Sequence, residues 1–388
     1  MRIQRARPRR GFALAVAIFA IVVIGALISG ALFASNQEYR IGANSLVQQR
    51  ALSAAEYGLD STVSGWQKSW NTSIAVGQVK TLSYTNSANL NGGWSNIPTS
   101  AQVTITHLNT LTFLVVSTGI AGTDPRNQAR RRVSVVLRIQ IPQMSFQGAL
   151  TTRGATKIGG SSLIDGDDHN PSGWNCPPTG SGLPGLATSD TSQIQTSGCN
   201  DYSCLNGTPK VVQVAAASDT NTYFNYNTST YATLTASADK IYPSGGAPAM
   251  PDPVVSNGTC LTTSSSNWGD PNRATPSGAC ESYFPIIWIQ GSASLSGGTG
   301  QGVLLVDGDL SVQGGFTFYG PVIVRGNLTA TGTGGHFNGG VMAANVDLGQ
   351  TTVLGNAVIN YSSCAVSSVL SSTTLPSSAS NRAWADMY

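Results

Sequence analysis

The sequence predicts a mainly β protein with one long amino-terminal α-helix, a small antiparallel sheet after that helix, and a larger parallel β-helix-like domain. Three observations predict this class. Residues Phe12 to Phe33 are almost all apolar, a short β-branched pattern repeats between Gly302 and Val346, and only 10% of the residues are charged while glycine occurs 44 times. Helix-rich cytosolic enzymes carry about 25% charged residues, so this composition favours a turn-rich exported protein.

The apolar run from Phe12 to Phe33 predicts a membrane-spanning helix. At about 1.5 Å per residue it is long enough for the ~30 Å hydrocarbon core. It exceeds the core of an ordinary cleaved signal peptide. Five arginines precede it and few charges follow it, so we expect a single pass through the bacterial inner membrane, with the amino terminus cytoplasmic and the bulk of the chain periplasmic.

The net positive charge of the chain comes from its amino terminus. Without those five arginines, 16 basic residues face 18 acidic ones. The remainder therefore lacks the basic field that nucleic-acid binding requires, and we expect no nucleic-acid partner. Arg130–Arg132 is the one later basic run; a solvated strand start is favoured over phosphate contact, because no aromatic residues interleave with it.

The helix is expected to continue beyond the membrane, giving a stem over residues 12–68. No proline occurs between Ser35 and Trp66. Leu52, Ala55 and Leu59 recur at helical spacing and predict a face that packs on a folded head. Within the membrane, small residues predict where stem helices approach each other closely, namely Gly25, Ala26, Ser29 and Gly30.

The amino-terminal region resembles the PilX-type minor pilins of type IV pilus assembly. The basic leader with Arg10-Gly11-Phe12 is similar to the signal of type IV pilins and pseudopilins, and the family pattern polar-Arg-Ala-x-x-Ala-Ala-Glu-x-x-Leu is matched by Arg50, Ala51, Ala54, Ala55, Glu56 and Leu59. The resemblance covers Arg9 to Asp60. It implies that residues 1–11 are a leader, removed by prepilin peptidase between Gly11 and Phe12.

One residue departs from the major-pilin pattern. Counting from Phe12, the fifth residue is Val16, where major pilins carry a glutamate. The resemblance therefore implies a minor, priming or tip-located subunit, whose partners are other pilin or pseudopilin subunits, inner-membrane assembly proteins, the peptidase and membrane lipid. A plain signal-anchored protein without a pilus is the alternative.

Residues 69–142 are expected to form a pilin-like antiparallel β region. Val103–Thr106, Leu111–Ser117 and Arg131–Ile141 alternate or are β-branched and predict strands. The connection from Gly119 to Gln128 contains turn formers and predicts a long loop between the last two strands. A sheet this small needs one face covered, which the stem can do.

A repeat predicts the larger domain, residues 143–361. Leu304–Leu310 matches Val322–Leu328 at an offset of 18 residues, a looser copy begins at Gly340, and Leu150–Ile158 has the same form. Short strands separated by Gly or Asn at this spacing are typical of stacked β-helix rungs. An antiparallel sandwich is the alternative.

An insertion at about residues 165–285 is expected beside the rungs, with local strands near Lys210–Ala215 and Thr230–Leu234, and a loosely packed Ser-rich tail over 362–388. Cysteines without a Cys-x-x-Cys spacing favour disulfides over metal or redox chemistry. Six of them allow 15 pairings, among which Cys260 with Cys280 is favoured; the candidates are Cys176, Cys199, Cys204, Cys260, Cys280 and Cys364.

One acidic segment is a candidate catalytic or metal site, because β-helices also host carbohydrate-active enzymes. Asp165, Asp167 and Asp168, followed by His169, could form a solvated acidic turn, a weak Ca²⁺ site or an acid–base pair. The turn is favoured, because EF-hand spacing is missing and no catalytic partner can be identified beyond Asp307 and Asp309.

The sequence therefore predicts an assembly protein without catalytic residues, cofactor or metal. Its function would be to join a type IV pilus or related pseudopilus through the stem and to display its head, which could be adhesive. A membrane-anchored β-helical carbohydrate-active enzyme and a stand-alone anchored adhesin or scaffold are the rivals.

Overall fold

The computed structural model describes residues 12–85, 97–122, 128–139, 141–227, 229–275, 278–346, 349–373, 376–378 and 384–387. The chain forms two compact units, which are described separately. The first contains residues 1–65, 76–137 and 378–388, and the second contains 66–75 and 138–377. The second unit is therefore inserted into the first between its fourth and its last strand.

The first unit combines one long helix with an antiparallel sheet. Helix α1 runs from Phe12 to Ser64; it ends four residues before the predicted limit of the stem. The sheet has the order β1-β2-β3-β4-β27, with β28 also on β4. Its strands are β1 (Val79–Thr85), β2 (Thr99–Asn109), β3 (Thr112–Ala121), β4 (Ala129–Ile139), β27 (Pro376–Ser378) and β28 (Trp384–Met387).

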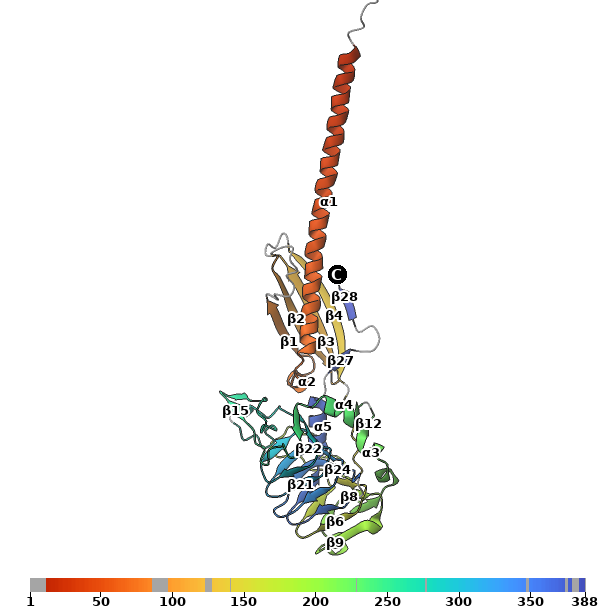
Figure 1. Ribbon diagram of the computed structural model, residues 1–388, viewed down its shortest axis with the longest axis vertical. Helices are drawn as coiled ribbons and strands as arrows, with labels where there is room; N and C mark the ends of the chain where they lie inside the picture. The colour runs from red at the N-terminus through yellow and green to blue at the C-terminus, as the bar shows by residue number, and fades with distance from the viewer. Residues whose placement is uncertain are drawn as a thin grey trace, which may run out of the picture. The chain divides into compact units, whose positions relative to one another are not determined.

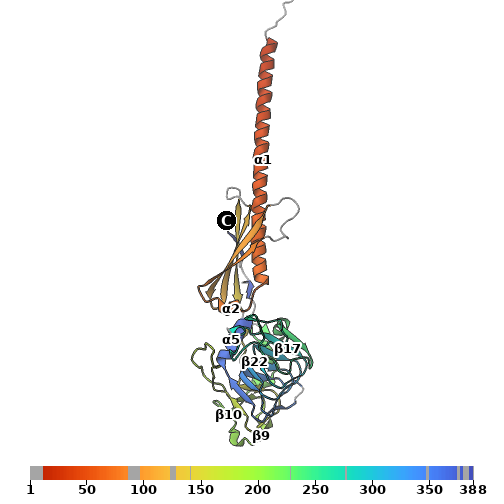
Figure 2. The same cartoon turned by 90° about the vertical axis from the view of Figure 1, so that its left-hand side faces the viewer.

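The carboxyl-terminal part of α1 lies along one face of this sheet (Figures 1 and 2). Strand β3 alternates strictly between buried and half-buried residues, as a strand covered on one face requires. Its buried face and that of β2 supply Phe113, Val115, Ala101, Val103 and Ile105. Strand β1 was not predicted, because its segment is polar and its residues are mostly exposed or half-buried.

The second unit is a stack of parallel strands, as the repeat predicts. One sheet has 12 strands and the other has six. The 12-stranded sheet contains β5 (Leu150–Thr152), β7 (Leu163–Asp165), β8 (Leu186–Thr188), β10 (Leu205–Asn206), β11 (Val211–Gln213), β14 (Lys240–Pro243), β17 (Ile286–Gln290), β19 (Thr299–Gln301), β20 (Val303–Val306), β22 (Thr317–Val324), β24 (His336–Ala343) and β26 (Val358–Tyr361). The six-stranded sheet contains β6 (Thr156–Gly159), β9 (Ile194–Ser197), β18 (Ala293–Leu295), β21 (Leu310–Val312), β23 (Leu328–Ala330) and β25 (Thr351–Val353).

The 18-residue offset read from the sequence is the register of the rungs. Leu304 pairs with Val322 in parallel strands, and Leu310 pairs with Leu328 in the second sheet. The looser copy follows, because Val322 pairs in turn with Val341. The antiparallel sandwich is thereby excluded for this region, since the strands of both sheets pair in parallel.

The predicted insertion at residues 165–285 contributes several strands to the stack. Strand β5 pairs with β24 on one side and with β8 on the other, and β8 pairs with β11. The chain thus builds rungs away from β5, then crosses to the opposite end, where β14 pairs with β17. The strand expected near Lys210–Ala215 is β11, but Thr230 instead caps the short helix α4 (Tyr231–Ala236), because its side chain accepts from the Thr233 N–H.

Short elements complete the second unit. They are α2 (Trp70–Ser73), α3 (Asn221–Phe224), the antiparallel pair β12 (Asn225–Tyr226) and β13 (Ser229–Thr230), and the antiparallel pair β15 (Val255–Ser256) and β16 (Thr259–Cys260). Three short 3₁₀ turns lie at Thr191–Gln193, Asn200–Tyr202 and Ala215–Ser218.

Two hydrophobic clusters hold the second unit together. Alternate residues of the rungs point inward; Leu304, Val322 and Val341 form one column of the interior cluster. The residues between them, such as Leu305 and Ile323, point outward and belong to the second cluster. Helices cover this outward column with Tyr223, Tyr231, Leu234, Val366, Val369 and Leu370.

The predicted Ser-rich tail over residues 362–388 is a packed element and then two strands. Helix α5 runs from Ser363 to Thr373. Val366, Val369 and Leu370 recur at helical spacing and are buried against the outward column. Ser367, Ser368 and Ser371 lie on the more exposed face, so overall composition hid an amphipathic helix. Strands β27 and β28 then return to the sheet of the first unit.

Candidate assembly surface on the amino-terminal helix

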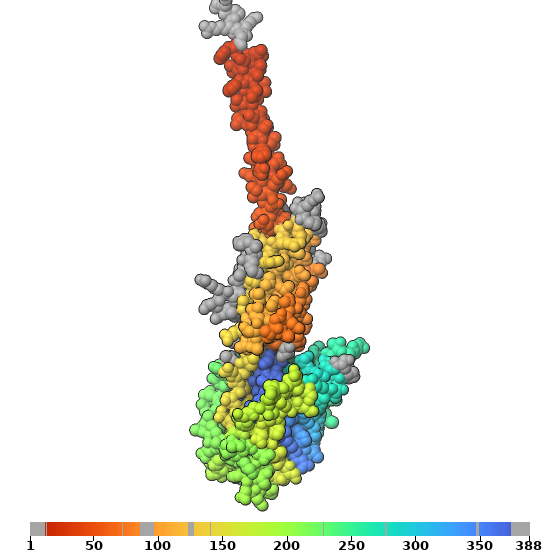
Figure 3. Space-filling model, turned by 180° about the vertical axis from the view of Figure 1, so that it is seen from behind, coloured from red at the N-terminus to blue at the C-terminus, as the bar shows by residue number. Residues whose placement is uncertain are grey.

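The amino-terminal half of α1 is uncovered by the rest of the described chain (Figure 3). From Phe12 to Phe33 its large apolar side chains are between 39% and 78% exposed. The helix is long and apolar enough to cross a membrane by length and composition. Exposing this much contiguous apolar surface to water is unfavourable, so contact with lipid or with another apolar partner would stabilise it.

The predicted stem-packing residues lie on this bare half. A methyl group built at Gly25 or at Gly30 would meet no atom within 4 Å. Ala26 and Ser29 are exposed as well. These glycines are therefore not required by the packing of this chain on itself. Phe12 is exposed, and Gly11 lies outside the described residues.

The carboxyl-terminal half of α1 carries the family motif, and the motif residues pack on the sheet. Ala54, Ala55 and Leu59 are buried, as is Ala51. Arg50 and Glu56 are half-buried beside this face. The buried face runs through Ala51, Ala54, Ala55, Gly58, Leu59 and Thr62, so Leu52, which the sequence analysis placed on it, lies at its side.

Two glycines, Gly58 and Gly119, set the distance between helix and sheet, a role that the sequence did not predict for them. A Cβ at Gly58 would lie 2.6 Å from the Cβ of Ala101 and 2.7 Å from the Oγ of Ser117. A Cβ at Gly119 would overlap the backbone of Ala51 and of Ala55. The sequence analysis placed Gly119 in a loop, whereas it lies inside β3. An isolated glycine in a strand pattern is the signal that predicts such close approach.

Polar contacts fix the helix at both ends of this face. The Thr62 hydroxyl lies 2.9 Å from the Tyr84 hydroxyl on β1. Near the other end, Arg131 of the basic run donates to the Gln48 side chain at 3.3 Å. One arginine of that run therefore contacts the stem, which adds a structural role to the solvated strand start that was expected.

The acidic segment does not form an open site. Asp165 and Asp168 are buried, contrary to the expected solvated turn. The Asp165 carboxylate accepts from the Asp167 N–H at 2.9 Å and from the Asn206 side chain at 3.2 Å, and it lies 3.1 Å from His169. Within the described residues, no group of three His, Cys, Asp or Glu side chains is arranged to hold a metal ion.

Asp168 fixes the start of α5. Its carboxylate accepts from the Ser363 N–H at 2.8 Å, from the Ser363 hydroxyl at 2.6 Å and from the Gly180 N–H at 2.6 Å. Burial opposes its ionisation, but the hydrogen bonds from Ser363 and Gly180 outweigh burial, and the pKa of Asp168 lies below its ordinary value of 3.8. Asp168 thus satisfies the first N–H of α5 from a distant part of the chain, in addition to the Ser362 hydroxyl, which accepts from the Ala365 N–H at 3.2 Å.

The other aspartates considered as catalytic partners lie elsewhere. Asp307 follows β20 and Asp165 ends β7, and strands β22, β24 and β26 lie between β20 and β7 in the sheet. Asp307 accepts from the Tyr231 hydroxyl and the Trp288 Nε1–H, each at 2.9 Å. Burial, followed by the charge of Asp307, raises the pKa of Tyr231 far above its ordinary value. Asp309 accepts from the Asn327 N–H at 2.7 Å.

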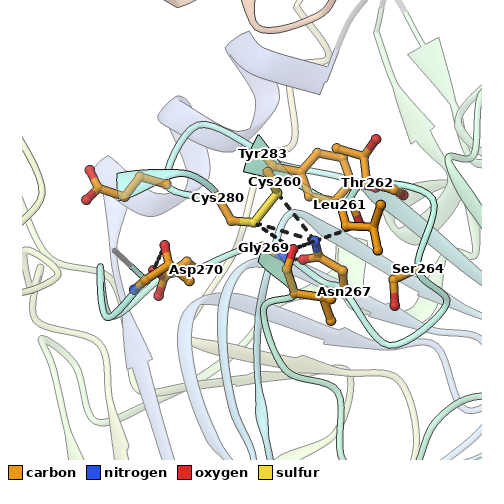
Figure 4. The surroundings of a disulfide bond; sticks show 12 residues. Cys260, Leu261, Thr262, Ser264, Asn267, Gly269, Asp270, Cys280 and Tyr283 are labelled. Carbon is orange, nitrogen blue, oxygen red and sulfur yellow. Dashed lines mark hydrogen bonds between the residues drawn. A yellow bond between two sulfur atoms is a disulfide. The ribbon is translucent and has the colours of Figure 1, made fainter. Parts of the chain in front are cut away.

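All six cysteines form disulfides: Cys176–Cys364, Cys199–Cys204 and Cys260–Cys280. The last is the pair that the sequence analysis favoured. Figure 4 shows the buried Asn267 beside it; its amide donates to the carbonyls of Val254 and Leu261 at 3.1 and 3.0 Å and lies 3.3 Å from the Cys260 sulfur. The bond and this asparagine together fix a loop that contains little regular structure.

The described chain has three main structural parts. It consists of a bare apolar half-helix, a packed half-helix on an antiparallel sheet, and a large inserted β-helical unit. An apolar amino-terminal helix that could cross a membrane by length and composition is thus combined with a mainly β remainder.

No family model matches the sequence, and no curated protein matches it. Among solved structures, the competence-associated pilin ComZ from Thermus thermophilus is similar, with 13% identity over 88% of this chain and 97% of that chain. The TM-score of that comparison is 0.26; a likeness this weak carries no weight for fold or function, which rest on the residues described above.

Proposed function

We propose that this chain is a minor-pilin-type subunit that joins a type IV pilus or a related pseudopilus. The single observation that carries the proposal is the division of α1 into a bare apolar half and a half that packs on its own sheet. A tether needs only the first feature. Small residues such as Gly25 and Gly30, beside which the described residues leave open space, provide close approach to neighbouring stem helices.

The proposal includes processing and location. Prepilin peptidase cleaves between Gly11 and Phe12, the mature stem resides in the inner membrane with its head outside, and the stem then enters the fibre with other subunits. Val16, in place of the glutamate of major pilins, makes this a minor or tip-located subunit of the PilX type. Its supporting observation is the motif from Arg50 to Leu59, whose alanines are buried against the sheet.

Mass spectrometry of the mature amino terminus tests the proposal. We expect the protein to begin at Phe12 in cells with prepilin peptidase and at Met1 when Gly11→Leu is introduced. We further expect the mature protein to co-purify with sheared surface fibres. Mature protein that begins at Met1 and is missing from every fibre preparation would contradict the assignment and leave an anchored exported protein.

The proposal includes a non-catalytic head. Its support is that Asp165 and Asp168 use their carboxylate oxygens in internal hydrogen bonds, as does Asp307. We expect no release of reducing sugar from acidic polysaccharides by the wild-type chain. Activity that disappears in the Asp167→Ala variant, which removes an exposed carboxylate, would instead establish a carbohydrate-active enzyme.

A further inference from the structure

A cavity of about 430 Å³ opens on the second unit beside α5. This volume lies in the range of pockets that bind small ligands. Aromatic, charged and hydroxyl side chains line it together: Trp174, Asn175, Arg273, Glu281, Ser282, Phe284, Ser367, Ser368, Ser371 and Ser372. These residues lie in loops and in α5, outside both the stem helix and the stacked strands.

Trp174 supplies a fixed aromatic wall. Its Nε1–H donates to the carbonyl of Pro271 at 2.9 Å. Its ring stacks on Tyr319 with centroids 5.8 Å apart, and it meets Phe284 at 5.6 Å edge to face. These three contacts hold the indole in one orientation, so a ligand that stacks on it loses little side-chain entropy to the protein.

Arg273 and Glu281 supply a polar pair whose charges cancel. Their side chains lie 3.3 Å apart, and each is about one-third exposed. Arg273 has a φ of +53°, in the left-handed region. The buried Asp270 holds this turn, because it accepts from the N–H groups of Ala274 and Thr275 at 3.1 and 2.6 Å. Strain of this kind persists where surrounding structure fixes it, often at binding sites.

The serines of α5 form the third wall. The Ser371 hydroxyl donates to the Ser367 carbonyl at 2.7 Å, and the Ser367 hydroxyl donates to the Cys364 carbonyl at 3.2 Å. With their hydrogens committed, both oxygens present lone pairs as acceptors. The Ser372 hydroxyl is buried and has no hydrogen-bond partner among the described residues.

Two disulfides brace these walls. Cys176–Cys364 joins the segment that carries Trp174 to the first turn of α5. Cys260–Cys280 lies next to Glu281, and the buried Gln301 amide donates to the carbonyls of Cys280, Glu281 and Tyr283 at 3.2, 2.9 and 2.9 Å. The cavity is therefore preorganised, which reduces the cost of ordering it around a ligand.

We propose that this cavity binds a neutral saccharide of one or two rings. A sugar ring has an apolar C–H face that suits Trp174, and a rim of hydroxyl groups that both donate and accept. The serine oxygens and Glu281 accept from that rim, and Arg273 donates to it. The neutralised Arg273–Glu281 pair disfavours a ligand with net charge.

The proposal rests on the proposed function and names the surface chemistry that a displayed head would recognise. The tests of the two remain separate, because saccharide binding is measured on the purified full chain in detergent, without fibres. If no saccharide binds but the chain still enters fibres, only the proposal of a saccharide site is contradicted. If a saccharide binds but no fibre contains the chain, only the assignment as a pilin-type subunit is contradicted.

Isothermal titration and saturation-transfer NMR with glucose, galactose, mannose, N-acetylglucosamine, lactose, maltose and chitobiose test the site. We expect at least one of them to bind with a Kd of about 1 mM or tighter. Trp174→Ala and Ser368→Gln should each weaken that binding by about tenfold or more, which corresponds to ~1.4 kcal/mol. Ser368→Gln guards against misfolding of the Trp174 variant, because glutamine is a good helix former.

The matched control is Asn272→Gln, which changes an exposed residue next to Arg273 that does not line the cavity. We expect it to bind as the wild type does. The proposal is overturned if none of the seven sugars binds at about 10 mM, or if Ser368→Gln binds as tightly as the control. Binding only of a charged sugar or a peptide would overturn it as well.

Discussion

Gly119 of β3 lies against the backbone of Ala55 in α1, with no space for a side chain between them. Helix and sheet approach so closely at this point because each presents its smallest residues there. Along the buried face of β3 the side chains diminish from Phe113 through Val115 and Ser117 to Gly119. The alanine-rich motif of the stem is thus explained by the shape of the sheet beneath it.

Replacing Gly119 should therefore loosen the first unit. Gly119→Val forces a side chain into a filled contact, and overpacking of this kind costs about 1–3 kcal/mol or more. We expect faster hydrogen exchange in residues 99–121, measured by mass spectrometry on the full chain. Thr118→Val, on the half-buried opposite face, is the control; equal exchange in the two variants would contradict the close contact.

Substitutions in the bare half of the stem should affect assembly and leave the folding of this chain unchanged. Gly25→Leu with Gly30→Leu adds bulk where the described part of the chain leaves open space, so we expect unchanged hydrogen exchange in both units. Because neighbouring stems could no longer approach closely, co-purification with fibres should fall severalfold. Gly42→Leu, another glycine of α1 with open space around it, is the control. Undiminished fibre content in the double variant would show that these glycines do not serve assembly.

The three disulfides should differ in their contribution to stability. They close loops with sequence separations of 188, 20 and 5 residues for Cys176–Cys364, Cys260–Cys280 and Cys199–Cys204. Loop-closure entropy then gives about 5, 3 and 2 kcal/mol, respectively. Urea unfolding of the three paired Cys→Ala variants checks this order. If the Cys199/Cys204 variant lost the most free energy of unfolding, the entropy of the unfolded chain would not govern the contribution of these disulfides.

Asp168 should make the second unit sensitive to acid. Its pKa is lowered in the folded chain, so the ionised form favours folding. This contribution is fully present above pH ~4 and decreases as the pH falls through the folded pKa. Asp168→Ala should cost about 1–3 kcal/mol at neutral pH, because the Ser363 and Gly180 donors lose their acceptor.

A pH series of urea unfolding measures this effect. The wild type should lose stability below pH ~4 more steeply than Asp168→Ala. Asp167→Ala, which removes the exposed neighbouring carboxylate, serves as the control and should leave the pH curve of the wild type unchanged. Parallel pH curves for the wild type and Asp168→Ala would contradict the role of this carboxylate.

Gln301 should hold the loop that follows Cys280. Gln301→Leu removes the donor to three carbonyls, and buried groups left unpaired cost about 1–3 kcal/mol. We expect faster hydrogen exchange over residues 278–284, whereas Gln313→Leu, at an exposed position of the stack, should leave it unchanged. Equal protection in both variants would mean that the disulfide alone fixes this loop.

The register of the β-helical stack could be predicted because a rung repeats its own chemistry. Leu304 and Val322 occupy equivalent positions and pair directly. The crossing of the chain from β11 to β14 could not be predicted, since the pairing of β5 with β24 joins residues nearly two hundred positions apart and leaves no periodic signal.

The functional surfaces also differ in how far they could be predicted from the sequence. The apolar run of the stem is visible in the sequence, because membrane-length hydrophobicity is a local property. Gly119, Asp168 and Gln301 act through partners far away in the chain, so their roles were missed or misassigned. The cavity beside α5 combines three segments of this kind, and two disulfides hold them.

By itself, the sequence determined the stem, its apolar half, the β-rich composition and the rung register, since each depends on neighbouring residues or on a regular repeat. Only the tertiary structure decided which face of the stem meets the sheet, where α5 packs and what surrounds Trp174. These features depend on contacts between distant segments, and such contacts are set by packing and hydrogen bonding in the folded chain.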